Sequence, residues 1–181
     1  MDFEKNLGGI VARAQQKDPA ALAEIFDFFF EPVFRFIFFR TKNRADAEDL
    51  THEVFLRIFE KIEKFKFTEK VSFAAWVFRI ARNLVIDFYR KKREVLEIPD
   101  DEIDENSTED LQEKTTNFFE RKRLKVALQK IPAAQRDCLE LKFFAELKNE
   151  EIAQTLKKTD IAVRTSISRG LKKLKQILDN F

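Results

Sequence analysis

The sequence predicts an all-α protein of two small helical domains joined by an acidic linker, with a helix-turn-helix at the end of the second domain. Residues that break regular structure are scarce, since the 181 residues include three Gly and four Pro, whereas a sheet protein needs turn residues every few positions. Apolar residues recur at helical spacing along most of the chain. The predicted boundaries are residues 1–93 and 118–181 for the domains and 94–117 for the linker.

The first domain is predicted to contain a long helix that begins at Asp18-Pro19, because Asp favours the cap and Pro the first helical position. Pro32 can kink this helix, since proline removes a backbone hydrogen bond. A second helix starts at Asn43 or Asp46. The apolar stripes of the two helices are Leu22, Ile25, Phe26, Phe29, Phe30, Val33 and Ile37, followed by Leu50, Val54, Ile58 and Ile62.

The segment WVFRIARNLVIDFYRKKR, residues 76–93, is predicted to form a helix with two different faces. Its apolar face consists of Val77, Ile80, Ala81, Leu84, Val85 and Phe88. Its polar face carries residues at spacings of three and four, namely Arg79, Asn83, Asp87 and Arg90. The basic end of the segment suits the negative pole of the helix dipole, and it equally suits an anionic ligand.

Charge is segregated along the chain, although the net charge is only +2. Residues 1–93 hold 18 basic and 14 acidic residues, residues 94–113 hold 10 acidic and no basic residues, and residues 114–181 hold 16 basic and 8 acidic residues. The acidic stretch contains Pro99 and few large apolar residues, so we interpret it as an extended linker. Two basic lobes on either side of it indicate a polyanion as their partner.

The second domain ends in a helix-turn-helix pattern. A stripe of Leu124, Ala127, Leu128 and Ile131 stops at Pro132, and AAQRDCLELKFFAEL forms the next helix. Asn149 is predicted to cap NEEIAQTL, and Thr159 or Asp160 to cap the last helix. The core side of that helix consists of Val163, Ile167, Leu171, Leu174 and Leu178, and the opposite side of Arg164, Thr165, Ser168, Arg169 and Lys172. Early residues of such a helix reach base edges, while a two-helix hairpin with a solvated charged face is the alternative.

The sequence gives little support to catalysis or metal binding. His52 is the only histidine, and Glu48 precedes it by four residues, but a metal site in a helical bundle needs further carboxylates and a second histidine. No phosphate-binding glycine loop or nucleophile elbow is found. We therefore expect no enzyme activity, no metal and no cofactor.

The chain reads as a cytoplasmic protein that does not insert into membranes. Its N-terminus lacks the apolar core of a secretory signal, and four charges interrupt the apolar run IFDFFFEPVFRFIFFR. Cys138 is the only cysteine, so no internal disulfide forms, which fits a reducing compartment. We interpret Cys138 as a small buried apolar residue.

Phenylalanine is unusually frequent, with 21 positions. Some of these residues spread beyond the core stripe of the first long helix, namely Phe28, Phe34, Phe38 and Phe39. Such residues either pack another helix of the same domain or form an exposed surface that docks a partner. The sequence leaves both interpretations open.

Several motifs, in order, resemble the extracytoplasmic-function sigma factors, which are promoter-specificity subunits of bacterial RNA polymerase. In the first domain they are Ala47-Glu48-Asp49-Leu50-Thr51, Glu53-Val54-Phe55-Leu56-Arg57, Trp76, Ile80-Ala81-Arg82-Asn83, Asp87 and Arg90. In the second domain they are Ile131-Pro132, Arg136, Glu151-Ile152-Ala153 and the stretch VRTSISRGLKKL that starts at Val163. The resemblance covers nearly the whole chain.

The resemblance implies partners and contact residues. The polymerase core would be bound through the clamp helices of its largest subunit by Asp46, Glu48, Asp49, His52, Glu53 and Phe55. The −10 element would be bound and opened by Phe67, Phe73, Arg79, Arg82, Asn83, Asp87, Arg90 and Lys91. The −35 element would be read by Arg164, Thr165, Ser168, Arg169, Lys172 and Lys173, in a domain that rests on the β-subunit flap. An anti-sigma factor is also implied.

These implied roles agree with the chemistry of the residues. A melted strand is held by cations and by aromatic faces on which bases stack, and a flipped base is read by hydrogen bonds. The chain departs from the family pattern at His52, where Gln is usual, at Lys157, where Gly is usual, and at Ile161-Ala162, where Gly-Thr is common. The alternative function is a stand-alone helix-turn-helix regulator with a helical dimerisation domain.

Overall fold

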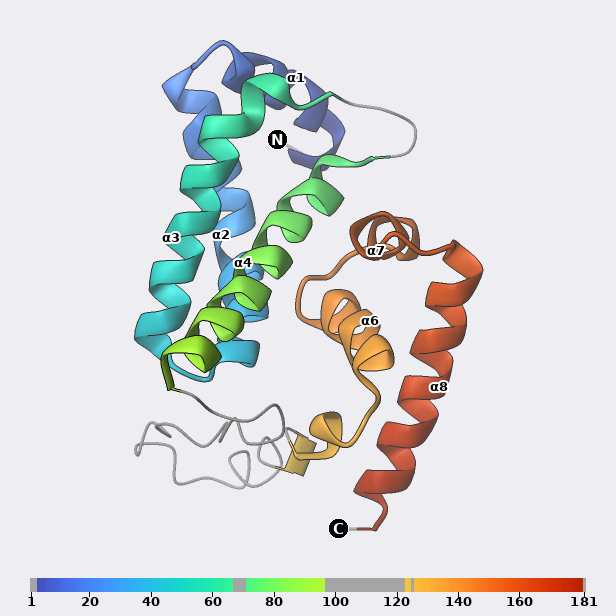
Figure 1. Ribbon diagram of the computed structural model, residues 1–181. Helices are drawn as coiled ribbons and strands as arrows, with labels where there is room; N and C mark the ends of the chain where they lie inside the picture. Colours follow the sequence, from blue (N-terminus) through green and yellow to red (C-terminus); the bar gives the residue numbers. More distant parts are fainter. Residues whose placement is uncertain (1–2, 67–70, 97–122, 125, 181) are drawn as a thin grey trace, which may run out of the picture. The chain divides into compact units, whose positions relative to one another are not determined.

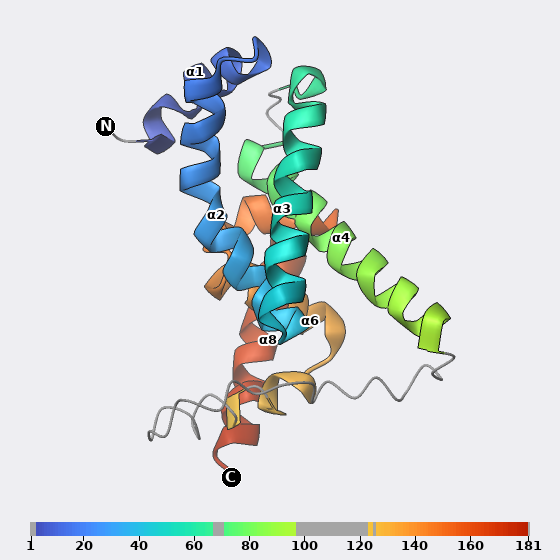
Figure 2. The ribbon, with the colours of Figure 1, turned by 90° about the vertical axis from the view of Figure 1, so that its left-hand side faces the viewer.

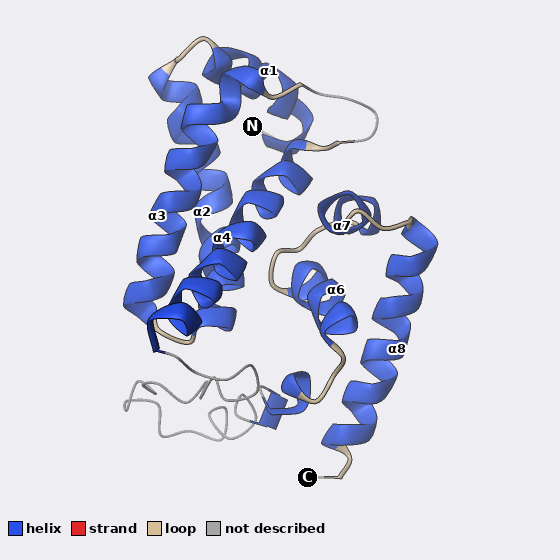
Figure 3. Cartoon of the chain, viewed as in Figure 1, coloured by secondary structure: helices blue, strands red, loops and turns tan. Residues whose placement is uncertain are grey.

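The structure is a computed structural model that describes residues 3–66, 71–96, 123–124 and 126–180. It divides the chain into two compact units, Met1–Ser107 and Thr108–Phe181. Every regular element within the described ranges is helical, which confirms the predicted all-α class (Figure 3). The predicted linker at 94–117 lies outside the described residues from residue 97 onward, so its boundaries stay a prediction.

The first unit is built from consecutive helices that pack side by side (Figures 1 and 2). They are α1 (Phe3–Gln15), α2 (Pro19–Thr41), α3 (Arg44–Lys61), the short 3-10 helix η1 (Ile62–Lys64) and α4 (Phe73–Leu96). α2 contacts α1, α3 and α4, while α3 also contacts α4. None of the helices in the described ranges has both the length and the apolar content that crossing a bilayer requires.

The starts of α2 and α3 follow from local capping chemistry, as predicted. Asp18 caps α2, because its Oδ1 accepts a hydrogen bond from the Ala20 N–H at 3.0 Å. Asn43 rather than Asp46 caps α3, since the Asn43 Oδ1 accepts from the Asp46 N–H at 3.0 Å. Pro32 lies inside α2, which continues past it to Thr41.

The core of the first unit is aromatic to an unusual degree. Edge-to-face pairs join Phe36 to Phe78 and Phe29 to Phe73, each with ring centroids 5.7 Å apart. This geometry is the favourable arrangement for two aromatic quadrupoles. The aliphatic part of the core comes from all four α-helices and includes Ile10, Val11, Ile25, Val33, Ile37, Val54, Ile58, Val77, Ala81 and Val85.

Many of the remaining phenylalanines form a row along α2. Phe26, Phe30, Phe34 and Phe38 follow one another at intervals of four residues, with successive ring centroids 5.1, 6.2 and 5.7 Å apart. Phe26 and Phe30 also contact Phe55 of α3 at 4.7 and 6.4 Å. The row therefore packs the α2–α3 pair at one end, while Phe38 at the other end is 43% exposed.

The second unit consists of a short helical stretch at 126–129 followed by α6 (Ala133–Phe143), α7 (Asn149–Leu156) and α8 (Asp160–Leu178). α8 packs against both α6 and α7. Gly170 allows α8 to approach α6 closely, because a Cβ at this position would lie 3.0 Å from the Leu139 Cδ1. The core is small and includes Ala127, Leu128, Ile131, Cys138, Leu139, Leu141, Leu147, Ile152 and Val163.

The helix starts of this unit were predicted with mixed success. Thr159 caps α8, since its Oγ1 accepts from the Ala162 N–H at 3.2 Å. The prediction that Asn149 caps α7 is wrong: Asn149 is already helical, and Lys148 takes the cap position. There the Lys148 N–H donates to the Glu151 carboxylate at 2.9 Å, so an acid three residues on replaces the missing polar cap. Leu171, predicted to face the core, is 42% exposed.

Candidate nucleic-acid interface

The polar face of α4 combines cations with one amide. Asn83, Arg90 and Lys91 are exposed, while Arg79 and Arg82 are half-buried along the same helix. Arg79, Asn83 and Arg90 share one side because they are four and seven residues apart. This side of α4 can therefore hold a polyanion with its cations and offer an amide that hydrogen-bonds a base edge.

Asp87 orients a cation in this face. Its Oδ1 lies 3.1 Å from the Arg90 Nη2, so the two side chains form an ion pair one helical turn apart. Arg90 is the more exposed partner. On a helix that binds a nucleic acid, the Asp87 carboxylate would repel phosphates, and its ion pair with Arg90 reduces that repulsion.

Ile86 also belongs to this face, and the sequence analysis missed it. It lies three residues after Asn83 and four before Arg90, and 44% of its surface is exposed. The signal was present in the sequence, since Ile86 falls on the arginine side of the helical period rather than on the apolar side.

The base of α4 is fixed by aromatic packing. Phe73 is fully buried and contacts Phe65 and Trp76, with ring centroids 5.2 and 5.4 Å away. The prediction that Phe73 stacks on bases therefore needs correction, because its ring lies in the core with no face open to a ligand. Phe67, the other predicted stacking residue, lies outside the described residues.

Gln15 of α1 forms hydrogen bonds with the segment from Ile62 to Phe65, which precedes α4. Its Nε2 donates to the carbonyl oxygens of Ile62 and Phe65 at 3.1 and 2.6 Å. At the other end of α4, the Tyr89 hydroxyl donates to the Arg40 carbonyl of α2 at 2.6 Å. The Tyr89 bond thus holds α4 to α2, and the Gln15 bonds hold the segment from Ile62 to Phe65 to α1.

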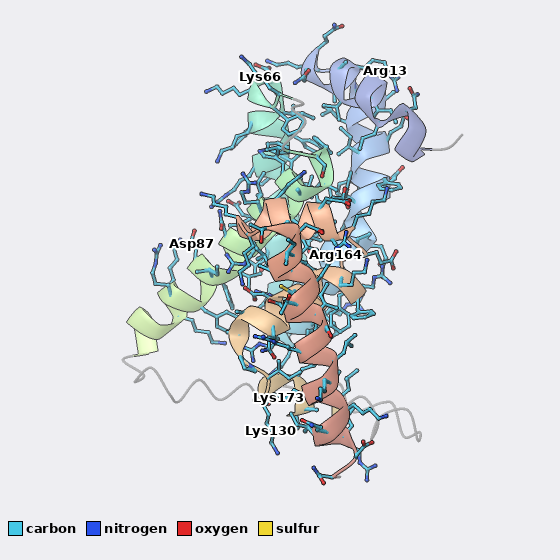
Figure 4. The ribbon with its side chains drawn as sticks, turned by 90° about the vertical axis from the view of Figure 1, so that its right-hand side faces the viewer. Arg13, Lys66, Asp87, Lys130, Arg164 and Lys173 are labelled. Atoms are coloured by element: carbon cyan, nitrogen blue, oxygen red, sulfur yellow. The ribbon has the colours of Figure 1, made fainter. Side chains whose placement is uncertain are left out.

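All six residues of α8 that were predicted to face the −35 element are exposed: Arg164, Thr165, Ser168, Arg169, Lys172 and Lys173. Figure 4 shows Arg164 and Lys173 on successive parts of this helix. The Arg164 Nε lies 2.5 Å from the Asp160 Oδ2, which orients the guanidinium in the first turns. The Thr165 hydroxyl is occupied locally, because it donates to the Ile161 carbonyl at 2.8 Å.

The predicted docking residues on α3 divide into exposed and engaged groups. Asp49 and His52 are exposed, whereas Glu48 and Glu53 pair with Arg44 and Arg57 at 2.8 and 2.7 Å. Asp46 is half-buried in the first turn. Leu56, which the sequence analysis did not single out, is 58% exposed one turn beyond His52.

Phe55 was predicted to dock a partner, and this needs correction. Its ring is buried and contacts the rings of Phe26, Phe30 and Phe59. The helical period explains the difference, since Phe55 lies four residues after the fully buried Thr51 and three before the fully buried Ile58.

The residues outside these faces include no metal-binding cluster within the described ranges and one buried thiol. No group of three or more His, Cys, Asp and Glu side chains is placed to hold a metal within the described ranges. Burial raises the pKa of the Cys138 thiol, an effect that Lys158 and a hydrogen bond with Ser166 partly offset. A thiol with a raised pKa stays protonated near neutral pH, as expected of a buried apolar residue.

Comparison with known proteins identifies the two units separately. Residues 30–95 match the family described as Sigma-70 region 2, and residues 121–174 match Sigma-70, region 4. The chain is 30% identical over 165 residues to the ECF RNA polymerase sigma factor RpoE of Cereibacter sphaeroides, with 88% of this chain and 87% of that protein covered. The chain belongs to the extracytoplasmic-function sigma factors.

A second relative of this sigma factor is BldN of Streptomyces coelicolor, an ECF RNA polymerase sigma factor, which is 32% identical over 171 residues. That alignment covers 93% of this chain and 64% of BldN. Two solved structures share the fold at 20% identity. CnrH in complex with the cytosolic domain of CnrY gives a TM-score of 0.72 over 94% of this chain and 96% of that one. RpoE in complex with the anti-sigma factor NepR from Bartonella quintana gives 0.68 over 87% and 96%.

The structure explains one departure of this sigma factor from the family pattern. Lys157 stands where Gly is usual, and its φ of 54° lies in the left-handed region that favours glycine. Its N–H donates to the Ala153 carbonyl, which ends α7. This chain therefore makes the tight turn between the two helices with a lysine in a conformation that favours glycine.

Proposed function

We propose that this sigma factor binds core RNA polymerase, reads the −35 element with α8, and binds and helps to melt the −10 element with α4. One observation carries the proposal: each unit that matches a sigma region presents one helix whose exposed side gathers cations. The role is that of a binding subunit, in which the polymerase supplies the catalytic chemistry. Its place of action is the cytoplasm, where the polymerase transcribes.

The α4 face suits a strand that is leaving the duplex. Arg79, Arg82, Arg90 and Lys91 neutralise phosphates, and Asn83 donates or accepts hydrogen bonds at a base edge. Ile86, exposed among these residues, offers an apolar surface against which an unstacked base can rest. Phe73 contributes by packing beneath the helix rather than by touching the strand.

The α8 face suits an intact duplex. The early residues Arg164, Thr165 and Ser168 reach the base edges of the major groove, whereas Arg169, Lys172 and Lys173 lie farther along and contact phosphates. The alternative function, a stand-alone helix-turn-helix regulator, is not favoured, because the chain matches both sigma regions.

The exposed side of α3 is the proposed contact with the clamp helices of the polymerase. It presents Asp49, His52 and Leu56 together, so an apolar contact is bordered by an acid. The second unit is proposed to rest on the β-subunit flap. An anti-sigma factor is the proposed regulator, supported by the structural neighbour RpoE from Bartonella quintana, which was solved in complex with the anti-sigma factor NepR.

The proposal is tested by mixing the full chain with purified core polymerase. We expect a stable complex by gel filtration and permanganate-reactive thymines at the −10 element of a bound promoter. Asp49→Lys should weaken the complex about tenfold or more, because a reversed charge at an interface costs about 1.4 kcal/mol or more. Asp27→Lys, which reverses an exposed acid of α2, is the matched control. A chain that binds operator duplex alone and ignores the polymerase would overturn the proposal.

A further inference from the structure

Ile161 is an isoleucine whose exposure is not explained by packing. It is the second residue of α8 and is 77% exposed, more than any other large apolar side chain in the described ranges. Val163, two residues on, is fully buried and holds this end of α8 to the unit. Ile161 therefore contributes nothing to the core, and as a β-branched residue it adds little to helix propensity.

The position of Ile161 on α8 places it at the N-terminal end of the face proposed to read DNA. Arg164, Thr165 and Ser168 follow it at three, four and seven residues, so all four project from one side of the helix. Arg164 is held by Asp160 through the ion pair described above. The Thr165 hydroxyl is occupied by the Ile161 carbonyl. The first turns of this face thus offer one oriented cation and one free apolar side chain.

A DNA major groove contains a single apolar group that matches such a side chain. Thymine presents a 5-methyl group there, next to its O4 acceptor, and no other base has an apolar substituent on that edge. The exposed cations of α8, including Arg169, Lys172 and Lys173, favour a phosphate-bearing duplex over an apolar protein as the occupant of this side. Within a recognition helix, the N-terminal residues are the ones that reach base edges.

We propose that Ile161 is a specificity residue that contacts the 5-methyl group of a thymine in the −35 element. The inference rests on the proposed function, since it assigns a base to the helix that is proposed to read this element. Where the family commonly has Gly-Thr, this chain has Ile161-Ala162, so the contact would distinguish its promoters from those of relatives with the small residue.

The test removes the methyl group from the DNA and the side chain from the protein. The holoenzyme is bound to a promoter duplex in which each thymine of the −35 region is replaced, one at a time, by deoxyuridine. At one position the wild-type chain should lose affinity about fourfold, the factor expected from burial of one methyl-sized apolar group. With Ile161→Ala, thymine and deoxyuridine at that position should bind equally, while all other positions keep their wild-type ratios.

The control is Leu171→Ala, which truncates another exposed apolar residue of α8, 42% exposed and far from its first turn. This variant should keep the wild-type ratio of thymine to deoxyuridine affinity at every position. The inference is overturned if no position responds to deoxyuridine, if Ile161→Ala keeps the wild-type response, or if it weakens only the binding of polymerase. Failure of the proposed function has another signature, in which the wild-type holoenzyme does not distinguish a promoter from unrelated duplex.

Discussion

The two helices proposed to contact DNA, α4 and α8, both expose cations but differ in how much of each is buried. Much of α4 lies in the core, with Phe73, Val77, Phe78, Ala81, Leu84 and Val85 buried against α2 and α3. In α8, only Val163 and Gly170 are buried. A helix that holds a separated strand must resist the strain of opening the duplex, so a deep anchor suits it. A helix that enters a major groove must expose most of its surface.

Both helices also expose an isoleucine within their polar face, Ile86 in α4 and Ile161 in α8. Exposing an apolar side chain to water costs free energy, and contact with a base recovers part of that cost by removing apolar surface from water. The two helices therefore differ in how deeply they are buried in their units. Their exposed faces are alike, because each combines cations with one isoleucine.

The largest expected effect tests the anchoring of α4. Phe78→Ala should lower the free energy of unfolding of the first unit by about 3–5 kcal/mol, because it removes a buried ring that packs edge-on against Phe36. Trp76, the only tryptophan, reports this unit by fluorescence during urea unfolding. The control Phe38→Ala, at an exposed ring, should cost less than about 1 kcal/mol. Equal costs for the two variants would contradict the proposed difference in burial.

The next effect tests the exposed face of α8. Arg164→Ala should weaken binding to promoters that depend on the −35 element by about 1–3 kcal/mol, because it removes a base-reading cation and leaves Asp160 without its partner. The measurement is holoenzyme affinity for duplexes with an intact or scrambled −35 sequence. Lys175→Ala, in the last turn of α8, should weaken both duplexes alike. If Arg164→Ala behaves in the same way, Arg164 reads no base.

A smaller effect tests the attachment of the far end of α4. Tyr89→Phe removes the hydrogen bond to the Arg40 carbonyl and should lower the stability of the first unit by about 1 kcal/mol. The same urea titration, followed through Trp76, measures this change. Open-complex formation should fall more than duplex binding does, since the polar face loses its anchor. A variant with unchanged stability would show that this bond does not hold α4 in place.

The smallest effect concerns the turn that positions α8. Lys157→Gly should stabilise the second unit by about 0.5–1 kcal/mol, because relief of the left-handed strain exceeds the added entropy of the unfolded chain. Lys158→Gly removes the same charge at a position without a positive φ, and it should destabilise the unit. Trp76 lies in the first unit, so its fluorescence does not report unfolding of the second unit. Far-UV circular dichroism measures the stability of the second unit in each variant. If Lys157→Gly and Lys158→Gly both stabilise the second unit, removal of the positive charge rather than relief of backbone strain is the cause.

The sequence alone predicted the helices from α2 onward and several of their starts, because these depend on local chemistry, but it missed α1 (Phe3–Gln15) and began α4 at residue 76 instead of Phe73. Asp18, Asn43 and Thr159 cap helices through their own side chains. Asn149 was misassigned because the cap position belongs to Lys148, whose N–H donates to the carboxylate of Glu151 three residues later.

The contact residues were harder to predict than the helices. Phe55 and Phe73 were assigned to ligands, yet other elements bury both rings, and helical spacing alone does not say which neighbours arrive. Ile86, Leu56 and Ile161 were assigned to no contact surface, since Leu56 was named only within a family motif and Ile161 only as a departure from the family pattern. All three are exposed. The predicted cations of α8 are all exposed, while Arg79 and Arg82 of α4 are half-buried, and their contact with DNA stays a prediction.

The central claim is that this chain directs a polymerase to promoters, and mapping of transcript starts tests it most directly. Purified core polymerase is supplied with fragmented bacterial DNA, with and without the chain, and the 5′ ends of the products are sequenced. We expect new starts at discrete sites that share a −35 and a −10 sequence. An identical set of starts in the presence and absence of the chain would contradict the account.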